Sequence, residues 1–596
     1  MSGLTDGNSG AILDPTSAVS MAPNRLRDNL GKLKVSESQN LFEADFEYGT
    51  QPMRWEIYTS GGGTVVANSA TGGVVMSVTA ASGDLAMRQT RAYVRYQPGK
   101  SVYMSTGFLF GTAYTNQRQR VGFFDDGNGA FFEQGDPTAA NPTGMGVVYR
   151  SDVNGSPTDT RVLLPNWSDP YGKVASINWQ NIQMLYVEYT WYGAGLLRWG
   201  VVIQGEPYIL HQIGIGNLAG QVTPWSRTAN IPVRYELRNV GASTASSMTH
   251  WGVSVLAEGK VDPQRGFTYG YGVSSRSATG TRYPALSLRY RVMGTLEYGV
   301  DAAYSGANGT LPTGGAAISI NATNTAASTT VTLTGTPLVA SAWIGKYIFC
   351  RGTTASITAI TISGTTATAA TVANPNYLTV GRWVIISGAT ATTGSVNGQV
   401  LITGVTANTF TFTTAATGPV TGTILYQSGQ GSVGRITANT TSTLTVVDNV
   451  QGGPMPIPPV ASANYILGIL DRGQILPQTL TITASAACTL ELVTSTYSSP
   501  VTLTGGTATN GTTFATMYSA GSLNSFSEKD TTSTGLTGGE VVYYAPIPAG
   551  GLLTFDLSNF FPLYNNVQGN QPDILSVAIT GTSTVSTSIV GQEAMS

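Results

Sequence analysis

LYVEYTWYGAGLLRWGVVIQGEPYILHQI, residues 185–213, is the stretch that decides the fold. Three runs rich in Val, Ile, Leu, Tyr and Trp are separated by Gly193-Ala194-Gly195 and by Gln204-Gly205-Glu206-Pro207. Aromatic and β-branched residues favour strands, and glycine-containing breaks of this length are typical of hairpin turns. The stretch therefore predicts three consecutive antiparallel strands.

The same strand and turn rhythm extends on both sides of this stretch. In VGFFDDGNGAFFEQ (121–134), two pairs of phenylalanines flank an Asp, Asn and Gly segment that suits a tight hairpin, because these residues tolerate positive φ. IPVRYELRNV (231–240) and HWGVSVLAEG (250–259) read as further strands. This order of hairpins predicts one antiparallel, jelly-roll-like β-sandwich over residues 41–262.

The composition restricts the classes of partner. The chain has 596 residues, of which only 10% are charged, and its formal net charge is −2. A soluble protein carries about a quarter charged residues, so Thr, Ser, Gly, Asn and Gln must cover most of this surface. No basic cluster predicts nucleic-acid binding, and no apolar run predicts membrane insertion. The first residues lack the pattern of a secretory signal, so we expect folding in a cytoplasm.

Residues 1–40 are mostly polar and contain one short helical pattern, at 25–34, interrupted by Gly31. We expect an N-terminal arm that is either a frayed terminus or a segment that docks on a neighbouring subunit. Cys350 and Cys488 lie far apart in sequence, in segments that read as different modules, which favours two buried thiols over a disulfide.

Several ordered motifs carry a resemblance to a known family. These are FEADFEYGTQPMRWE (42–56), RAYVRYQPGK (91–100), GFFDDGNGAFFE (122–133), VEYTWYGAGLLRWGVVIQGE (187–206) and IPVRYELRN (231–239). Together they resemble a family of tailed-bacteriophage virion proteins with an N-terminal concanavalin-like (laminin-G-like) β-sandwich, over about residues 38–262. The resemblance implies a virion structural protein of the tail, baseplate, fibre or head-decoration type.

The second half changes character at residues 311–470, which are rich in Thr, Ala, Gly and Val and carry very few charges. The flanking segments 282–293 and 471–493 read as strong strands without local partners. Resemblance to the same family implies that both belong to one C-terminal sandwich. We therefore predict a second sandwich formed by residues 263–310 and 471–596, with 311–470 inserted as small β-modules. Long insertions are tolerated because closure entropy grows only logarithmically with loop length.

Few residues suit catalysis or metal binding. The chain has two histidines, His211 and His250, and both lie in aromatic, strand-like surroundings that favour packing. Two Cys and two His without short spacing do not form a zinc site. Asp125, Asp126 and Asn128 are a weak candidate for a cation site, but the run lacks the spacing of an EF-hand loop, and a hairpin turn is the preferred interpretation. We expect no cofactor.

Glycoside hydrolysis would require two carboxylates about 5–10 Å apart. Glu43, Asp45 and Glu47 have the spacing of one strand face. They alternate with apolar residues, however, as in any strand with one solvated face. No acidic cluster surrounds Glu188, which lies between Val187 and Tyr189. The sequence therefore predicts a protein that is not an enzyme.

Carbohydrate or partner binding without catalysis is a further hypothesis. Trp191, Tyr192, Trp199 and Tyr208 fall within one pair of hairpins and are candidates for stacking on a sugar. The competing interpretation is that these aromatic side chains pack between the two sheets.

The sequence thus leads to a non-enzymatic structural component of a tailed-phage virion, assembled in the host bacterial cytoplasm. The leading hypothesis is a tail, baseplate or fibre protein that binds copies of itself, with a trimer favoured, and other virion proteins. The first alternative is a capsid-surface decoration protein or head fibre. The second is a receptor- or polysaccharide-binding adhesin that contacts a host surface glycan.

Overall fold

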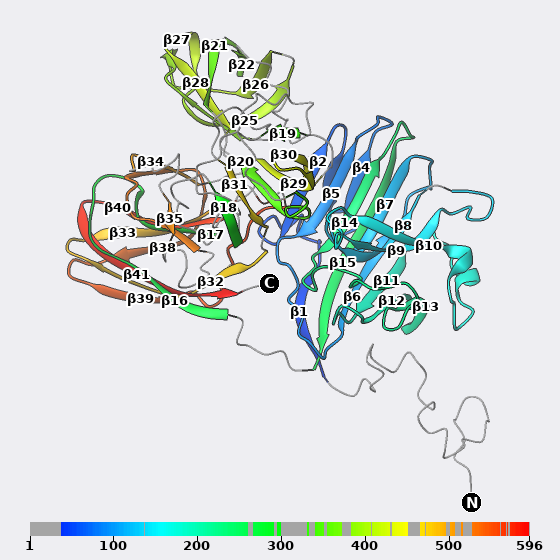
Figure 1. Cartoon of the computed structure of the whole chain (residues 1–596). Helices are drawn as coiled ribbons and strands as arrows, with labels where there is room; N and C mark the ends of the chain where they lie inside the picture. The colour runs from blue at the N-terminus through cyan, green and yellow to red at the C-terminus, as the bar shows by residue number, and fades with distance from the viewer. Residues whose placement is uncertain are drawn as a thin grey trace, which may run out of the picture. The chain divides into compact units, whose positions relative to one another are not determined.

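The structure is a computed structural model (Figure 1). It describes residues 37–135, 137–259, 266–290, 295–299, 330–332, 340–350, 354–371, 383–406, 408–428, 432–450, 465–470, 472–495, 501–506, 514–516, 527–560, 562–567, 569 and 572–594. Contacts divide the chain into two compact units, one of residues 1–153 with 157–264 and one of residues 154–156 with 265–596.

The first unit contains two antiparallel sheets, which we call the front sheet and the back sheet of the first sandwich. The front sheet runs in the order β13 (Glu206–Gly214), β12 (Leu196–Ile203), β11 (Gln183–Tyr189), β6 (Val102–Leu109), β15 (Ser246–Glu258), β4 (Gly73–Val78) and β3 (Thr64–Asn68), and β1 (Ser38–Ala44) also pairs with β15. The back sheet runs in the order β10 (Thr158–Leu163), β9 (Met145–Ser151), β8 (Gly129–Gln134), β7 (Gln117–Phe124), β14 (Val233–Asn239), β5 (Leu85–Thr90) and β2 (Trp55–Ser60). Two short 3-10 helices, η3 (Leu164–Asn166) and η4 (Val174–Ser176), follow β10.

The predicted hairpins are confirmed. Strands β11, β12 and β13 are consecutive antiparallel neighbours, and β7 and β8 pair around residues 125–128. At the β12–β13 turn Gln204 and Gly205 both have positive φ, 53° and 85°, which is the backbone of a type I′ turn. This turn matches the right-handed twist of the strands that it joins, so the local sequence is enough to specify the reversal.

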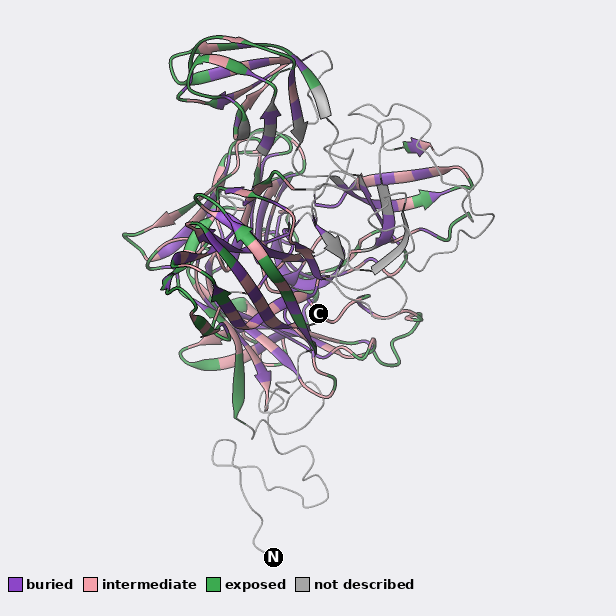
Figure 2. Cartoon of the chain, turned by 90° about the vertical axis from the view of Figure 1, so that its left-hand side faces the viewer, coloured by how far each residue is buried: buried purple, intermediate pink, exposed green. Residues whose placement is uncertain are grey.

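The core of the first sandwich lies between the front and back sheets. Alternate residues of each strand point into it, including Val121 and Phe123 on β7 and Val187 and Tyr189 on β11. In Figure 2 the strands carry both buried and exposed positions along their length. The residues between the inward ones therefore face outward, and on the back sheet these outward residues carry most of the charge.

The second unit contains the C-terminal sandwich, also of two antiparallel sheets. One has the order β16 (Gly266–Ala278), β41 (Ser583–Ala594), β32 (Gln474–Ala484) and β39 (Leu552–Asp556). The other has the order β35 (Ala515–Thr516), β36 (Ser527–Asp530), β17 (Tyr283–Tyr290), β40 (Ile574–Thr580), β33 (Cys488–Thr494) and β38 (Glu540–Ile547). The short strands β34 (Thr502–Thr504) and β37 (Gly535–Thr537) form a separate pair.

The strands on either side of the inserted segment share one core. Leu286 and Leu288 of β17 belong to the same buried cluster as Leu480 and Ile482 of β32. The backbone N–H of Gly473 also donates to the hydroxyl of Tyr290, at 3.1 Å. The end of β17 and the start of β32 therefore lie next to each other, although about 180 residues separate them in sequence.

The inserted segment forms further β-modules, and one of them also includes a strand that precedes residue 311. One sheet has the order β18 (Thr295–Gly299), β31 (Tyr465–Ile469), β20 (Tyr347–Cys350), β29 (Ser432–Asn439), β30 (Thr443–Asp448) and β19 (Thr330–Thr332). A closed barrel consists of β21 (Thr354–Ser363), β22 (Thr366–Thr371), β26 (Thr409–Thr413), β25 (Gly398–Val405), β23 (Trp383–Ser387) and β28 (Ile424–Ser428). Strands β24 (Thr390–Thr393) and β27 (Thr417–Thr421) pair with each other.

The fold class is therefore confirmed: the chain is all-β, with antiparallel sandwiches and inserted β-modules. The numerical limits of the domains stay a prediction, and the arm lies outside the described residues up to residue 36. Cys488 is a buried free thiol, as expected, whereas the side chain of Cys350 lies outside the description. Within the described part of the chain, no helix has the length and apolar character needed to cross a membrane.

Candidate functional site

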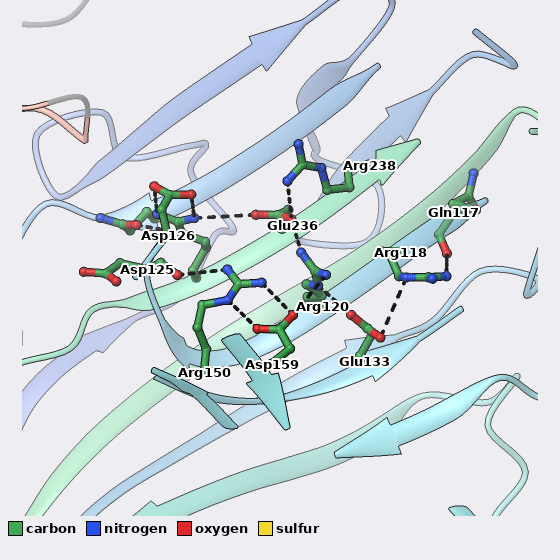
Figure 3. Close-up of polar contacts among 12 residues, drawn as sticks. Gln117, Arg118, Arg120, Asp125, Asp126, Glu133, Arg150, Asp159, Glu236 and Arg238 are labelled. Atoms are coloured by element: carbon green, nitrogen blue, oxygen red, sulfur yellow. Dashed lines mark hydrogen bonds and ion pairs between the residues drawn. The ribbon is translucent and has the colours of Figure 1, made fainter. Parts of the chain in front are cut away.

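The densest group of ionisable side chains covers the outer face of the back sheet (Figure 3). We call it the charged network. Its members are Arg120 on β7, Glu133 on β8, Arg150 on β9, Asp159 on β10, and Arg234 and Glu236 on β14. Five of the six are buried, which is unusual for charged side chains unless they are paired.

Opposite charges alternate across neighbouring strands of the network. Arg120 donates from Nε to Glu133 at 2.7 Å and from Nη1 to Glu236 at 2.8 Å. Arg150 forms a bidentate pair with Asp159, with distances of 2.7 and 3.0 Å. Charge-assisted, bidentate bonds of this kind are the strong ones, and here they connect β7 to β8, β9 to β10, and β7 to β14.

Aromatic rings lie beneath the guanidinium groups. Phe124, Phe131 and Val148 form a small buried cluster on the outer face of the sheet. The guanidinium carbons of Arg120 and Arg150 lie 5.5 and 5.3 Å from the centre of the Phe131 ring. Cation–π contacts and the apolar stems of the arginines therefore cover this face, so that part of the desolvation cost of the charges is offset.

The carboxylates of the network are held in their ionised form. Burial alone would raise the pKa of Glu236, but the guanidinium groups of Arg120, Arg238 and Arg234 overcome that effect and lower the pKa to about 2. The pKa of Glu133 is lowered in the same way, against burial, by Arg120 and Arg161. A general acid for glycoside cleavage needs a raised pKa instead, so these carboxyls are suited to pairing rather than to proton transfer.

The three candidate cation ligands lie in the β7–β8 turn. Asp125 Oδ1 accepts hydrogen bonds from the backbone N–H of residues 127 and 128, both at 2.8 Å. Asp126 accepts two bonds from Arg234, at 2.9 and 3.1 Å. Asn128 donates to Asp152, and its Oδ1 accepts from the backbone of Arg227. These oxygens already accept hydrogen bonds from donors of the protein, so the contacts favour a turn that is held in place by hydrogen bonds. Cation binding stays a prediction.

The remaining His, Cys, Asp and Glu side chains of the described residues do not form a metal site either. Within the described ranges, no three His, Cys, Asp or Glu side chains are grouped so that they could hold a metal ion.

The structure separates the four candidate aromatic residues. Trp199 is fully buried in the core, and Trp191 is half-buried, with its Nε1 donating to the carbonyl of Ser226 at 2.9 Å. Tyr192 is 56% exposed and Tyr208 half-buried. Trp191 and Tyr192 lie at the β11–β12 turn, whereas Tyr208 lies on β13 opposite Val201, about 17 Å beyond that turn by strand length. They do not form one surface, and a binding role stays a prediction.

Both histidines lie in the first sandwich with their acceptor nitrogens occupied. Ser168 N–H donates to Nδ1 of His211 at 3.0 Å, and burial lowers the pKa of this imidazole to about 4. The Nη1 of Arg88 lies 3.2 Å from Nε2 of His250, whose ring stacks on Tyr235 at 3.8 Å. Burial, and then Arg88, lower the pKa of His250 well below its usual value. An imidazole whose lone pair accepts a hydrogen bond is not placed to act as a general base.

Glu188 faces outward from the front sheet. It lies opposite Arg198 on β12, with 3.5 Å between their charged atoms, and both side chains are buried. In the next row Tyr186 lies across Gly200, where an added Cβ would come within 2.2 Å of the ring. The rings of Tyr186 and Tyr103 stack at 5.1 Å. This face is therefore packed around an ion pair, which the sequence analysis did not foresee.

The acids near the N-terminus behave as the strand pattern predicts. Glu43, Asp45 and Glu47 are exposed, whereas Ala44 and Phe46 are buried. The prediction of a strand face open to solvent is confirmed for Glu43, whereas Asp45 and Glu47 lie beyond β1, which ends at Ala44. None of these acids shares a hydrogen bond with the charged network in the described part of the chain.

Sequence comparisons identify no relative: no protein-family model and no curated protein matches the chain. Among solved structures, similar chains include a glycosyl hydrolase family 16 protein from Mycobacterium smegmatis, with 10% identity, a TM-score of 0.25 and coverage of 36% of this chain and all of the other. The Emp47p carbohydrate recognition domain has 12% identity and a TM-score of 0.25, with 38% and 98% coverage. Lectin I-B4 from Griffonia simplicifolia has 12% identity and a TM-score of 0.22, with 36% and 99% coverage. Similarity at this level says nothing about what this chain binds or acts on.

Proposed function

We propose that this chain is a non-enzymatic structural component of a tailed-phage virion, of the tail, baseplate or fibre type. In this role it acts by self-association and by docking to other virion proteins. The virion assignment rests on the ordered motifs of residues 38–262 that resemble such a family. The structural character of the role rests on the architecture and on how the chain uses its charged groups.

The observation that carries the structural role is the charged network. An active site keeps at least one ionisable group accessible and tuned to gain or lose a proton near the working pH. Here Glu236 and Glu133 have lowered pKa values and are buried against Arg120, which joins β14, β8 and β7. Asp159 of β10 contacts both Arg120 and Arg150, so that the network extends to β9 and β10 and links five strands. The ion pairs of this network hold neighbouring strands together and make the sheet more rigid. A rigid sheet suits a protein whose role is structural within an assembly.

The proposal is tested on particles of the phage that encodes this chain. Particles are purified on a density gradient, and the chain is quantified by mass spectrometry against the major capsid protein. We expect the chain to remain with the particles through washing, at a copy number that follows the three-fold or six-fold symmetry of a tail. An abundant host protein, followed in the same fractions, is the control for carry-over.

The copy number also separates the two positions on the particle. A capsid-surface decoration protein would be present in much larger multiples than a tail component. Antibody labelling of intact particles, viewed by electron microscopy, gives the position independently. Absence of the chain from washed particles would contradict the virion role altogether.

A further inference from the structure

Strand β38 is an open edge of the C-terminal sandwich. Within the described residues its one strand partner is β33, so its other side presents backbone N–H and C=O groups. Three of its side chains are exposed: Val541 by 48%, Tyr543 by 37% and Tyr544 by 63%. An exposed apolar edge strand is a template for pairing with another strand, and proteins normally protect such edges.

Other edges of the chain show that protection. At the front sheet, the backbone N–H of Asp169 donates to the carbonyl of Leu210 on β13, so a loop covers part of that edge. At the back sheet, the edge strand β10 carries Asp159 and Arg161, and charged side chains discourage pairing. Strand β38 has one charged residue, Glu540, at its first position and one proline, Pro546, at its seventh, so that the stretch Val541–Ala545 between them carries neither kind of protection.

The neighbouring edge enlarges the apolar surface. A tight turn joins β38 to β39, where Leu552 is 64% exposed. The ring of Tyr543 packs edge-on against Phe555 of β39, with 5.1 Å between ring centres, which fixes the edge in shape. All exposed large apolar side chains described in the C-terminal sandwich belong to this β38–β39 edge.

The size of this surface sets the strength of the contact that it can support. At the exposures given, the two tyrosines, the valine and the leucine present roughly 400 Å² per copy, since one aromatic side chain covers about 150–250 Å². A standard interface takes about 800 Å² from each partner. Because this surface is smaller than that of a standard interface, we expect its side chains and strand hydrogen bonds to support a reversible contact. Further contacts in an assembly would strengthen it.

We propose that Val541–Ala545 of β38 pairs antiparallel with the same residues of a second copy of this chain, about a two-fold axis. Such a contact is self-complementary because each copy contributes the same strand. It also keeps like charges apart: the two Glu540 residues lie just outside opposite ends of the paired segment, about 20 Å from each other, which exceeds the screening length at physiological salt. The inference rests on the strand edge alone and does not depend on the virion role.

Two-fold pairing implies an even number of copies, in contrast to the trimer that the sequence analysis favours. The test is sedimentation velocity of the full chain from about 1 to about 100 µM, the range in which a reversible contact of this size dissociates. We expect masses at even multiples of 62.2 kDa that fall to the monomer on dilution. A trimer, or a monomer at every concentration, would overturn the proposal.

Tyr544→Lys places a charge on the edge without touching the core cluster. We expect it to weaken association by at least about tenfold, since a buried tyrosine is a typical hot spot. Tyr48→Lys is the matched control, because it makes the same change at a tyrosine that is 88% exposed in the first sandwich, and association should not change. Unaltered thermal melts of both variants show that the fold is kept. Equal association of Tyr544→Lys and the wild-type chain would refute the assigned edge.

Discussion

Replacing Glu236 with glutamine should destabilise the first sandwich through the charged network. The carboxylate lies 2.8 Å from Arg120 and 3.5 Å from Arg234, and all three side chains are buried. Glutamine keeps the size of the side chain but removes the charge, so that two buried guanidinium groups lose a counter-ion. Removing one partner of a buried pair is costly because the other charge stays desolvated.

The pKa of Glu236 gives the magnitude. The difference between its ordinary value of 4.5 and the value of about 2 in the folded chain corresponds to about 3 kcal/mol of stability at neutral pH. Because the folded pKa is lowered, this stability is fully present above pH 4.5 and is lost as the pH falls from 4.5 towards 2. The difference between the wild-type chain and Glu236→Gln should therefore be largest at neutral pH and shrink over that window.

Urea unfolding followed by tryptophan fluorescence measures this difference. Residues 41–262 contain seven of the nine tryptophans, so the signal reports mainly on the first sandwich. Glu47→Gln is the matched control, because it makes the same chemical change at an exposed position and should shift the free energy of unfolding by less than about 0.5 kcal/mol. A loss for Glu236→Gln as small as that of the control, or one that does not vary between pH 7 and pH 3, would refute the reasoning.

Four other perturbations follow from the structure. His250 is held neutral by burial, so as the pH falls below 6.5 the unfolded chain takes up a proton that the folded chain does not, and the folded state loses stability. His250→Gln should remove about 1 kcal/mol of the stability that is lost between pH 7.5 and 5.5, as measured by urea unfolding. An unchanged pH dependence would contradict this expectation. Gly200→Ala should destabilise the first sandwich by about 1–3 kcal/mol, because the added Cβ would meet the ring of Tyr186. Gly107→Ala is the control and should cost less, because its Cβ would make an ordinary contact at 3.5 Å. Equal melting temperatures of the two variants would argue against the close contact at Gly200. A chain in which a short Gly/Ser linker replaces residues 293–470 should stay soluble with an unchanged melt of the C-terminal sandwich, because the flanking strands share one core, and aggregation would count against the nested topology. The fragment 38–262 should likewise show a cooperative melt on its own, and its insolubility would show that the sandwich needs the rest of the chain.

Local sequence determined the strands, the turns and one pair of the charged network. Alternation along a strand and the preference of Gly, Asn and Asp for positive φ act over a few residues, so the β7–β8 hairpin around residues 125–128 could be read directly. Once that hairpin is given, counting outward from the turn places Arg120 opposite Glu133. The sequence of this hairpin is therefore sufficient to specify the pairing of these two residues.

Tertiary structure decided which faces are covered and which distant charges meet. Glu236 reaches Arg120 because β14 lies beside β7, and Asp126 reaches Arg234 across 108 residues of sequence. Trp199 of β12 is buried because the back sheet covers its side of the strand, whereas Tyr192 lies in the β11–β12 turn and is exposed. Strand periodicity fixes the alternation along β12 but not which side another sheet will cover. Strand order is set by the summed burial of both sheets, a free energy spread over the whole core. No local pattern encodes it, and for that reason two of the candidate ligands of the turn, Asp126 and Asn128, proved to be partners of Arg234 and Arg227 far along the chain.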